Sequence, residues 1–145
     1  SCQKRPKSLL NVSYAMKSQL PFKRFSPLTN QNLKRIFRRD EDGCLVELIF
    51  QFSKEFLHVC ANENNDTIDF KVHRSHDLKG FCEETSSKNW ESLIGKKFCW
   101  GWVAVNQQGF FDMVALSFGT IFPKIVLNVT GSSINIGEIT FRKGT

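Results

Sequence analysis

The feature that most constrains this sequence is a series of short apolar segments, each separated from the next by only a few polar residues. Strands joined by so few residues pair antiparallel, because a parallel crossover needs about a dozen residues or more. The pattern predicts about seven strands, over residues 44–52, 56–61, 67–72, 97–105, 110–118, 124–129 and 134–141. The sequence therefore predicts a mainly β fold (α+β), an antiparallel meander rolled into a barrel or a sandwich.

The strongest of these predicted strands is the segment 97–105. Phe98, Trp100 and Trp102 occupy alternate positions, and the intervening positions are largely apolar as well. A strand that is apolar on both faces is typical of one that is covered on both sides. We therefore expect this segment to be the central, enclosed strand of the fold.

Two short helices are predicted beside the strands. The first is indicated by apolar residues that would fall on one side of a helix: Leu28, Leu33, Ile36 and Phe37. The alternative for this segment is an irregular lead-in to the first strand. The second spans residues 89–94 and is followed by a glycine, the residue that commonly ends a helix. We expect this second helix to cover one open end of the sheet.

Basic residues are segregated at the start of the chain. Residues 1–39 contain ten of the twenty Lys and Arg residues and none of the fourteen Asp and Glu residues, so the remainder carries a net charge of −4. We predict a basic, flexible leader at 1–27 and a single β-rich domain at 28–145. The asymmetry indicates an anionic partner. A solvated tail, a targeting segment, or sequence upstream of an initiator at Met16 would explain the same pattern.

The candidate anion-binding residues lie in and just after this leader: Lys23, Arg24, Lys34, Arg35, Arg38 and Arg39. Basic side chains interleaved with phenylalanine suit single-stranded nucleic acid, where charges follow the backbone and rings stack on the bases. The same pattern suits an amphipathic patch on an anionic membrane. A third interpretation is that the apolar residues of this segment dock against the strands.

A second candidate site is a ligand pocket formed by Asp112, Trp100, Trp102 and Gln108. Asp112 is the only carboxylate in its apolar strand, and burying an ionised carboxylate is costly unless it is paired. An indole N–H or the neighbouring turn could supply that partner. Alternatively, Asp112 is a structural residue that caps the turn by bonding to nearby backbone. The tryptophans would then pack in the core as large aromatic residues usually do.

The long connection at 73–88 carries His73, His76 and Cys82, which are residue types that bind zinc. No second pair at a matching spacing accompanies them, so we predict no metal site and no cofactor. The sequence also lacks a nucleophile elbow, a His-Glu-x-x-His motif and a phosphate-binding glycine loop. Catalysis is therefore not favoured.

The five cysteines favour a reducing compartment, because no two lie closer than 16 residues and no CxxC pair exists. Cys44, Cys60 and Cys99 lie in apolar runs, where a free thiol packs as a small hydrophobic group. No segment approaches the roughly 18 unbroken apolar residues of a membrane-spanning helix. We therefore expect a soluble, cytoplasmic protein without a transmembrane segment.

Two segments carry a resemblance to known proteins. Residues 100–112, Trp-Gly-Trp-Val-Ala-Val-Asn-Gln-Gln-Gly-Phe-Phe-Asp, and residues 131–136, Gly-Ser-Ser-Ile-Asn-Ile, resemble a family of small uncharacterised bacterial proteins that is frequent in cyanobacteria. The resemblance covers about residues 40–141 and leaves out the basic leader. It implies a cytoplasmic bacterial protein and supports the domain boundary, and it implies no activity.

These observations favour a non-enzymatic binding or accessory module that contacts a protein or a small ligand through its β domain. The leader would then attach to an anionic partner. The first alternative is a nucleic-acid-associated protein that binds through residues 1–39, and the second is a small enzyme with a pocket near Asp112. The sequence does not identify the partner, and exposed edge strands would permit a homodimer.

Overall fold

Nine antiparallel strands in two sheets dominate the part of the chain that the computed structural model describes, residues 21–144. The larger sheet has the order β4-β3-β2-β1-β5 and consists of β1 (Leu33–Glu41), β2 (Cys44–Phe52), β3 (Phe56–Asn62), β4 (Thr67–His73) and β5 (Cys82–Glu83). The smaller sheet has the order β6-β7-β8-β9 and consists of β6 (Phe98–Val105), β7 (Phe111–Phe118), β8 (Ile125–Thr130) and β9 (Ser133–Glu138). A short helix, α2 (Pro21–Phe25), and a 3₁₀ turn, η1 (Ser26–Leu28), precede β1.

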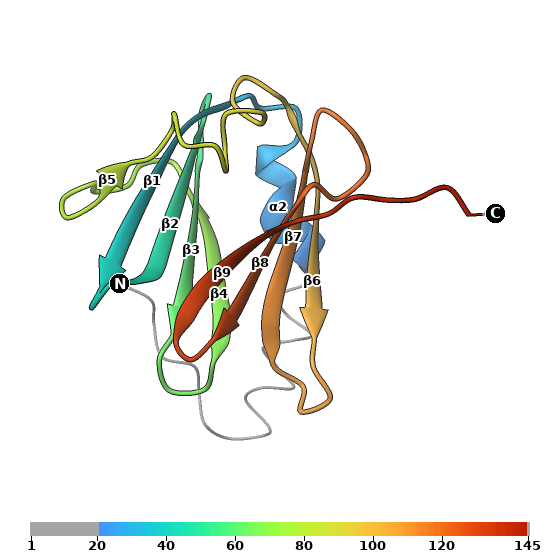
Figure 1. The fold of residues 1–145 in the computed structure, drawn as a ribbon. Coiled ribbons are helices and arrows are strands. Elements are labelled where there is room, and N and C mark those ends of the chain that lie inside the picture. Colours follow the sequence, from blue (N-terminus) through green and yellow to red (C-terminus); the bar gives the residue numbers. More distant parts are fainter. Residues whose placement is uncertain (1–20, 145) are drawn as a thin grey trace.

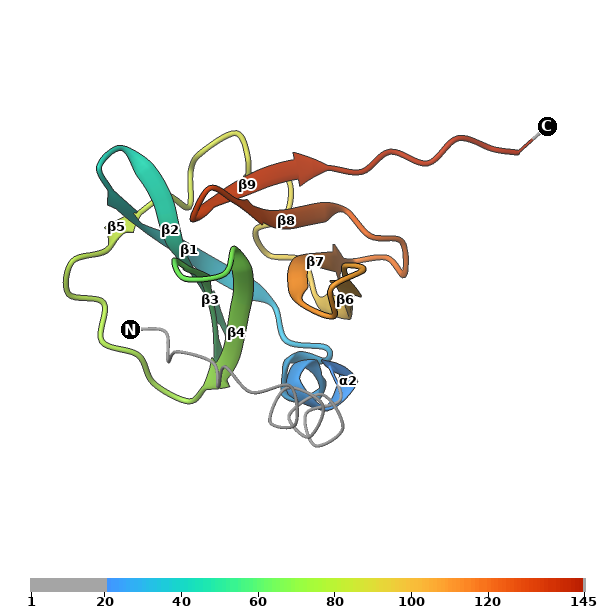
Figure 2. The ribbon, with the colours of Figure 1, turned by 90° about the horizontal axis from the view of Figure 1, so that it is seen from below.

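The two sheets pack face to face, and Figures 1 and 2 show α2 beside the gap between β4 and β6. No strand of one sheet pairs with a strand of the other, so the fold is a sandwich and not a closed barrel. The mainly β, antiparallel fold is therefore confirmed, with the sandwich as the correct alternative. The core lies between the sheets, where side chains from every strand except the short, exposed β5 pack together.

All seven predicted strands are present, but the helix predicted from Leu33, Ile36 and Phe37 is wrong, because these residues lie in β1. The pairing of β1 with β2 shifts register between Leu33 and Arg35. An extra residue at such a shift puts side chains three positions apart on one face of a strand. Leu33 and Ile36 are consequently both fully buried in the core, and their spacing imitates a helical one.

The second predicted helix, at residues 89–94, is also wrong. Residues 85–95 form a series of turns, in which the carbonyl of Ser87 accepts hydrogen bonds from the amides of Trp90 and Glu91. Trp90 is fully buried, and its ring meets the ring of Phe50 edge-on at 5.4 Å between centroids. The segment therefore anchors the connection in the core through one tryptophan, without forming a helix.

The segment with two tryptophans is not the enclosed central strand that we expected. β6 is an edge strand of the smaller sheet, and Trp100 is 56% exposed. The pairing of β6 with β7 shifts register between Phe98 and Gly101, which turns Trp100 away from the core face. The buried hydroxyl of Ser117 stabilises this shift, because it accepts a hydrogen bond from the Trp100 amide (2.8 Å) and donates one to the Trp100 carbonyl (3.3 Å).

The division into a leader at 1–27 and a domain at 28–145 stays a prediction, but one residue of the predicted leader packs against the sheets. Phe25 of α2 is buried, and its ring stacks on the ring of Phe70 at 4.8 Å between centroids. The remainder of the predicted flexible leader, residues 1–20, lies outside the described residues. Within α2, the Arg24 guanidinium lies over the Phe70 ring at 4.8 Å, which adds a cation–π contact.

The ring of Phe25 packs directly on the backbone of β6 at Gly101. A Cβ atom at Gly101 would lie 2.5 Å from Cδ2 and 2.7 Å from Cγ of Phe25, which is far inside contact distance. Because Phe25 is held by Phe70 on its other side, its ring has little room to move away. Glycine at position 101 is therefore required for α2 to lie against β6.

We predict that Gly101→Ala displaces Phe25 and lowers the free energy of unfolding by about 1–3 kcal/mol, as overpacking of a core does. Urea denaturation followed by circular dichroism measures the change. Gly137→Ala in β9 is the matched control, because its Cβ would meet only the Val126 carbonyl oxygen at 4.0 Å. An equal loss of stability in both variants would contradict the role given to Phe25.

Candidate functional site

The four residues of the predicted ligand pocket are spread along the β6–β7 hairpin. Gln108 and Asp112 lie at its turn, whereas Trp100 lies near the start of β6, beside Ser117 of β7, and Trp102 pairs with Ala115. Asp112 accepts a hydrogen bond from the side-chain amide of Asn106 (3.4 Å), and the Asn106 side-chain oxygen accepts hydrogen bonds from the amides of Gln108 and Phe110. Asp112 thus supports the turn through Asn106. The ring centroids of Trp100 and Trp102 lie 6.0 Å apart. A ligand pocket at these residues stays a prediction.

The basic residues predicted to bind an anion divide into two groups. The first group forms ion pairs within the chain: Arg35 with Glu83, Arg38 with Asp40 and Glu84, and Arg39 with Glu41 and Glu47. Lys23 and Lys34 are exposed, and Arg24 lies on Phe70. Acidic residues of the domain therefore neutralise part of the basic segment, and its binding to an anionic polymer stays a prediction.

A cleft of about 700 Å³ opens at the other end of the smaller sheet. Three segments line it: the residues just before β6, the end of β7 with the connection to β8, and the segment that follows β9. The last two are held together by a hydrogen bond from the Ile139 amide to the Lys124 carbonyl (2.9 Å). Figure 1 shows the C-terminal segment passing this connection.

The cleft combines exposed aromatic rings with positive charge. Phe122 and Phe141 are 58% and 59% exposed, and their ring centroids lie 5.8 Å apart. Lys96, Lys97 and Lys124 also line the cleft, and none of them forms an ion pair with a carboxylate of residues 21–144. Exposed rings beside unpaired ammonium groups can bind a molecule that has both an apolar part and a negative charge.

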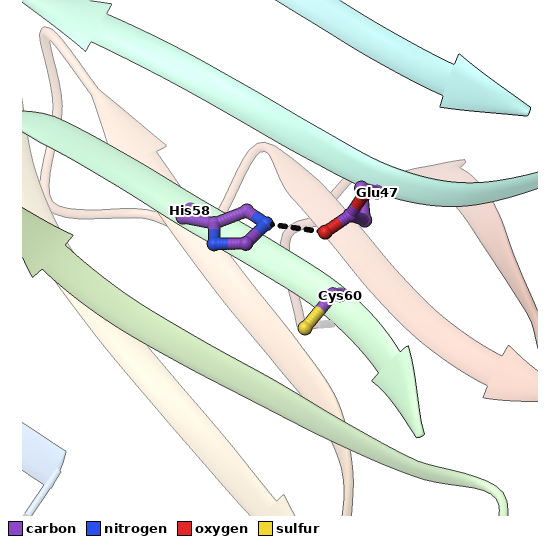
Figure 3. A group of neighbouring side chains, drawn as sticks. All are labelled: Glu47, His58 and Cys60. Carbon is purple, nitrogen blue, oxygen red and sulfur yellow. Dashed lines mark hydrogen bonds and ion pairs between the residues drawn. The ribbon is translucent and has the colours of Figure 1, made fainter. Parts of the chain in front are cut away.

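A second candidate site is a buried polar cluster on the outer face of the larger sheet, shown in Figure 3. Glu47 on β2 and His58 on β3 are only 5% and 6% exposed. Nε2 of His58 lies 2.9 Å from Oε1 of Glu47, and the other carboxylate oxygen accepts a hydrogen bond from Arg39. Both oxygens of this buried carboxylate are therefore satisfied, as burial requires.

The electrostatics of this cluster favour an ionised Glu47. Burial by itself would raise the pKa of Glu47, but hydrogen bonds and charge from His58 and Arg39 outweigh it and lower the pKa to about 2. An ionised carboxylate only accepts hydrogen bonds, so Nε2 of His58 carries the proton and donates it to Glu47. The second ring nitrogen, Nδ1, lies on the side turned away from Glu47 (Figure 3).

The other two histidines of the chain lie beside His58. The ring of His76 is 4.6 Å from that of His58, and the ring of His73 is 6.4 Å from it. The ring of Phe81 lies next to His58 and His76. Burial lowers the pKa of His73, and the positive charges that His76 and His58 would carry lower it further.

The residues considered for zinc in the sequence separate in the structure. Cys82 is exposed in β5, which pairs with β1, whereas His73 and His76 lie beside His58. Cys60 lies next to Glu47 and His58, with ligand atoms of the three within 4.8 Å of one another. The free thiol expected at Cys60 is wrong, because Cys60 is disulfide-bonded and offers no thiolate.

Sequence reasoning missed this cluster for a structural reason. Glu47 and His58 are 11 residues apart, and they become neighbours only when β2 and β3 pair in the register Ile49 to His58 and Glu47 to Cys60. The available signal was a charged residue and a histidine inside two otherwise apolar strands that are joined by a short turn. Their meeting on one face depends on the register, which the turn sets.

The comparisons with known proteins give one result. Residues 16–143 match the model of a family of unknown function, DUF6334. The chain belongs to this family. The match confirms an uncharacterised family, and it also includes most of the basic segment that the sequence resemblance, at about residues 40–141, left outside. No curated protein and no solved structure matches the chain.

The helices of the structure were also compared with the requirements for spanning a membrane. Across residues 21–144, none of the helices has the length and apolar character needed to cross a bilayer.

We predict that Glu47→Gln lowers the free energy of unfolding at neutral pH. It should also make that free energy less dependent on pH in the acid range. A carboxyl whose pKa falls from 4.5 to about 2 on folding stabilises the fold above about pH 4.5, and this contribution of about 3 kcal/mol is lost as the pH falls towards 2. Urea denaturation at several pH values measures it.

Glu83→Gln is the matched control, because Glu83 and Arg35 form an exposed ion pair at 3.7 Å. Such a pair contributes at most about 1 kcal/mol. A difference between the wild type and Glu47→Gln that stays constant from neutral pH to about pH 2 would contradict the assignment of an ionised, buried carboxylate to Glu47.

Proposed function

We propose that this protein is a non-enzymatic binding module, and that the cleft between β6, the β7–β8 connection and the C-terminal segment binds a small ligand. The ligand has an apolar, preferably aromatic, body and a negatively charged group. The observation that carries the proposal is the pair of exposed rings, Phe122 and Phe141, next to three lysines without ion-pair partners in the described chain.

The size and chemistry of the cleft support a small ligand. A volume of about 700 Å³ lies within the range of roughly 300–1,000 Å³ that is common for small-molecule sites. Isolated exposed apolar residues need no explanation, but Ile121, Phe122 and Phe141 are each about 60% exposed and lie close in one region. An apolar patch of this kind marks a binding surface, and the lysines select for an anion.

The absence of recognisable catalytic motifs in the sequence favours binding over catalysis. Residues that line the cleft include lysines, aromatic residues and Thr120 and Thr140, with no histidine, cysteine or carboxylate among them. General acid–base catalysis near neutral pH relies most often on such groups. The module would therefore hold its ligand rather than transform it.

The test uses anilinonaphthalene sulfonate, a fluorescent probe that has an aromatic body and one negative charge. We expect one saturable site on the full chain, with affinity reduced about tenfold or more in Phe122→Ser, because the ring loses its contact. Lys124→Glu should weaken binding similarly and should reduce its dependence on salt. Fluorescence titration at two salt concentrations measures both effects.

Trp100→Ser and Lys54→Glu are the matched controls. Trp100 is about as exposed as Phe122, and Lys54 is exposed like Lys124, but neither Trp100 nor Lys54 lines the cleft. Circular dichroism excludes unfolding as the cause of any change. Equal losses in Trp100→Ser and Phe122→Ser, or no effect of Lys124→Glu, would show that the probe binds elsewhere and would refute the proposal.

A further inference from the structure

The three histidines of this chain all meet at one place on the outer face of the larger sheet. His58 lies in β3, His73 is the last residue of β4, and His76 lies in the connection that follows. Their ring centroids are 4.6 Å (His58 to His76), 5.7 Å (His73 to His76) and 6.4 Å (His58 to His73) apart.

Two of these imidazoles have one ring nitrogen committed to a fixed acceptor. Nε2–H of His58 donates to the carboxylate of Glu47 at 2.9 Å, and Nδ1–H of His76 donates to the backbone carbonyl of Asp77 at 2.8 Å. A neutral imidazole then has a lone pair on its other nitrogen, Nδ1 of His58 and Nε2 of His76. Histidines that bind metals are held in the same way, by a carboxylate or a backbone carbonyl on the second nitrogen.

We propose that His58, His73 and His76 form a binding site for one divalent transition-metal ion of the zinc class. Three imidazoles on one tetrahedral ion, with metal–nitrogen distances of about 2 Å, have ring centroids about 5 Å apart. The observed separations of 4.6–6.4 Å bracket this value. The ligand nitrogens of these three rings do not all lie within 4.8 Å of one another in this structure. His73 and His76 are only half-buried, so binding turns their rings toward the shared ion.

The groups around the histidines suit such an ion. Glu47 is a positioning residue, because it orients His58 and places a negative charge beside it. The ring of Phe81 lies beside the rings of His58 and His76. Imidazole nitrogen is a preferred ligand of zinc, copper and nickel. Three protein ligands leave a fourth position open to water or to another ligand.

The alternative ligand set is Glu47, His58 and Cys60, whose ligand atoms lie within 4.8 Å of one another. Both oxygens of Glu47 already accept hydrogen bonds, from His58 and Arg39, and Cys60 is disulfide-bonded. This set would have to break three existing interactions to bind a metal. The histidine set breaks none of them, so it is the favoured one.

The test is a titration of the full chain, without an affinity tag of histidines and after dialysis against a chelator. We expect calorimetry to give one Zn²⁺ per chain, and Co²⁺ to give the visible absorption of a four-coordinate site. His73→Gln and His76→Gln should each weaken Zn²⁺ binding about tenfold or more, because each removes a ligand. Zn²⁺ should raise the unfolding temperature of the wild type more than that of either variant.

Cys82→Ser is the matched control, because Cys82 is the third residue of the sequence pattern but lies in β5. It should bind Zn²⁺ as the wild type does. His73 and His76 are replaced in preference to the buried His58, and unfolding in chelator confirms that the variants fold. Absence of Zn²⁺ binding by the wild type, or wild-type affinity in both histidine variants, would overturn the proposal. These results are independent of probe binding in the cleft.

Discussion

The structure depends on contacts between the inner faces of two sheets that share no strand pairing. A series of phenylalanine rings makes these contacts across the sandwich. Phe52 of β2 meets Phe98 of β6 and Phe118 of β7 at 5.9 and 6.3 Å between centroids, and Phe25 of α2 lies between Phe98 and Phe70 of β4. Because large aromatic side chains bury much apolar area, these few residues join all the elements that flank the gap between β4 and β6.

This filled interior explains where binding sites can exist. The inner faces of both sheets are occupied by the core cluster, so functional groups lie outside it. Polar residues on the outer face of β2 and β3 are buried all the same, and their burial is balanced by hydrogen bonds among Arg39, Glu47 and His58. The cleft lies instead where β6 begins and the C-terminal segment crosses the β7–β8 connection. The two sites differ in chemistry, a carboxylate with imidazoles in one and aromatic rings with lysines in the other.

Much of the fold could be predicted because its connections are short. Hairpins such as β2–β3 and β8–β9 were recognisable from apolar runs around brief polar turns, and their strands appear close to the expected positions. The wrong predictions occur where a register shift interrupts the alternation of side chains between the two faces of a strand. The shift after Leu33 made a strand resemble a helix, and the shift after Phe98 moved Trp100 from the expected interior to the surface. A local pattern cannot show such a shift, since it is defined by the partner strand.

The sequence by itself determined the fold class, the antiparallel hairpins and the segregation of positive charge in the first 39 residues, because each follows from composition or from neighbours in the chain. The tertiary structure decided which strands lie at the sheet edges, which arginines are neutralised, and which histidines meet. Arg38 pairs with Glu84 across 46 residues, and His58 contacts His76 across 18. Such pairs form only when sheet register and the path of a long connection bring distant residues together, and no local period encodes that path.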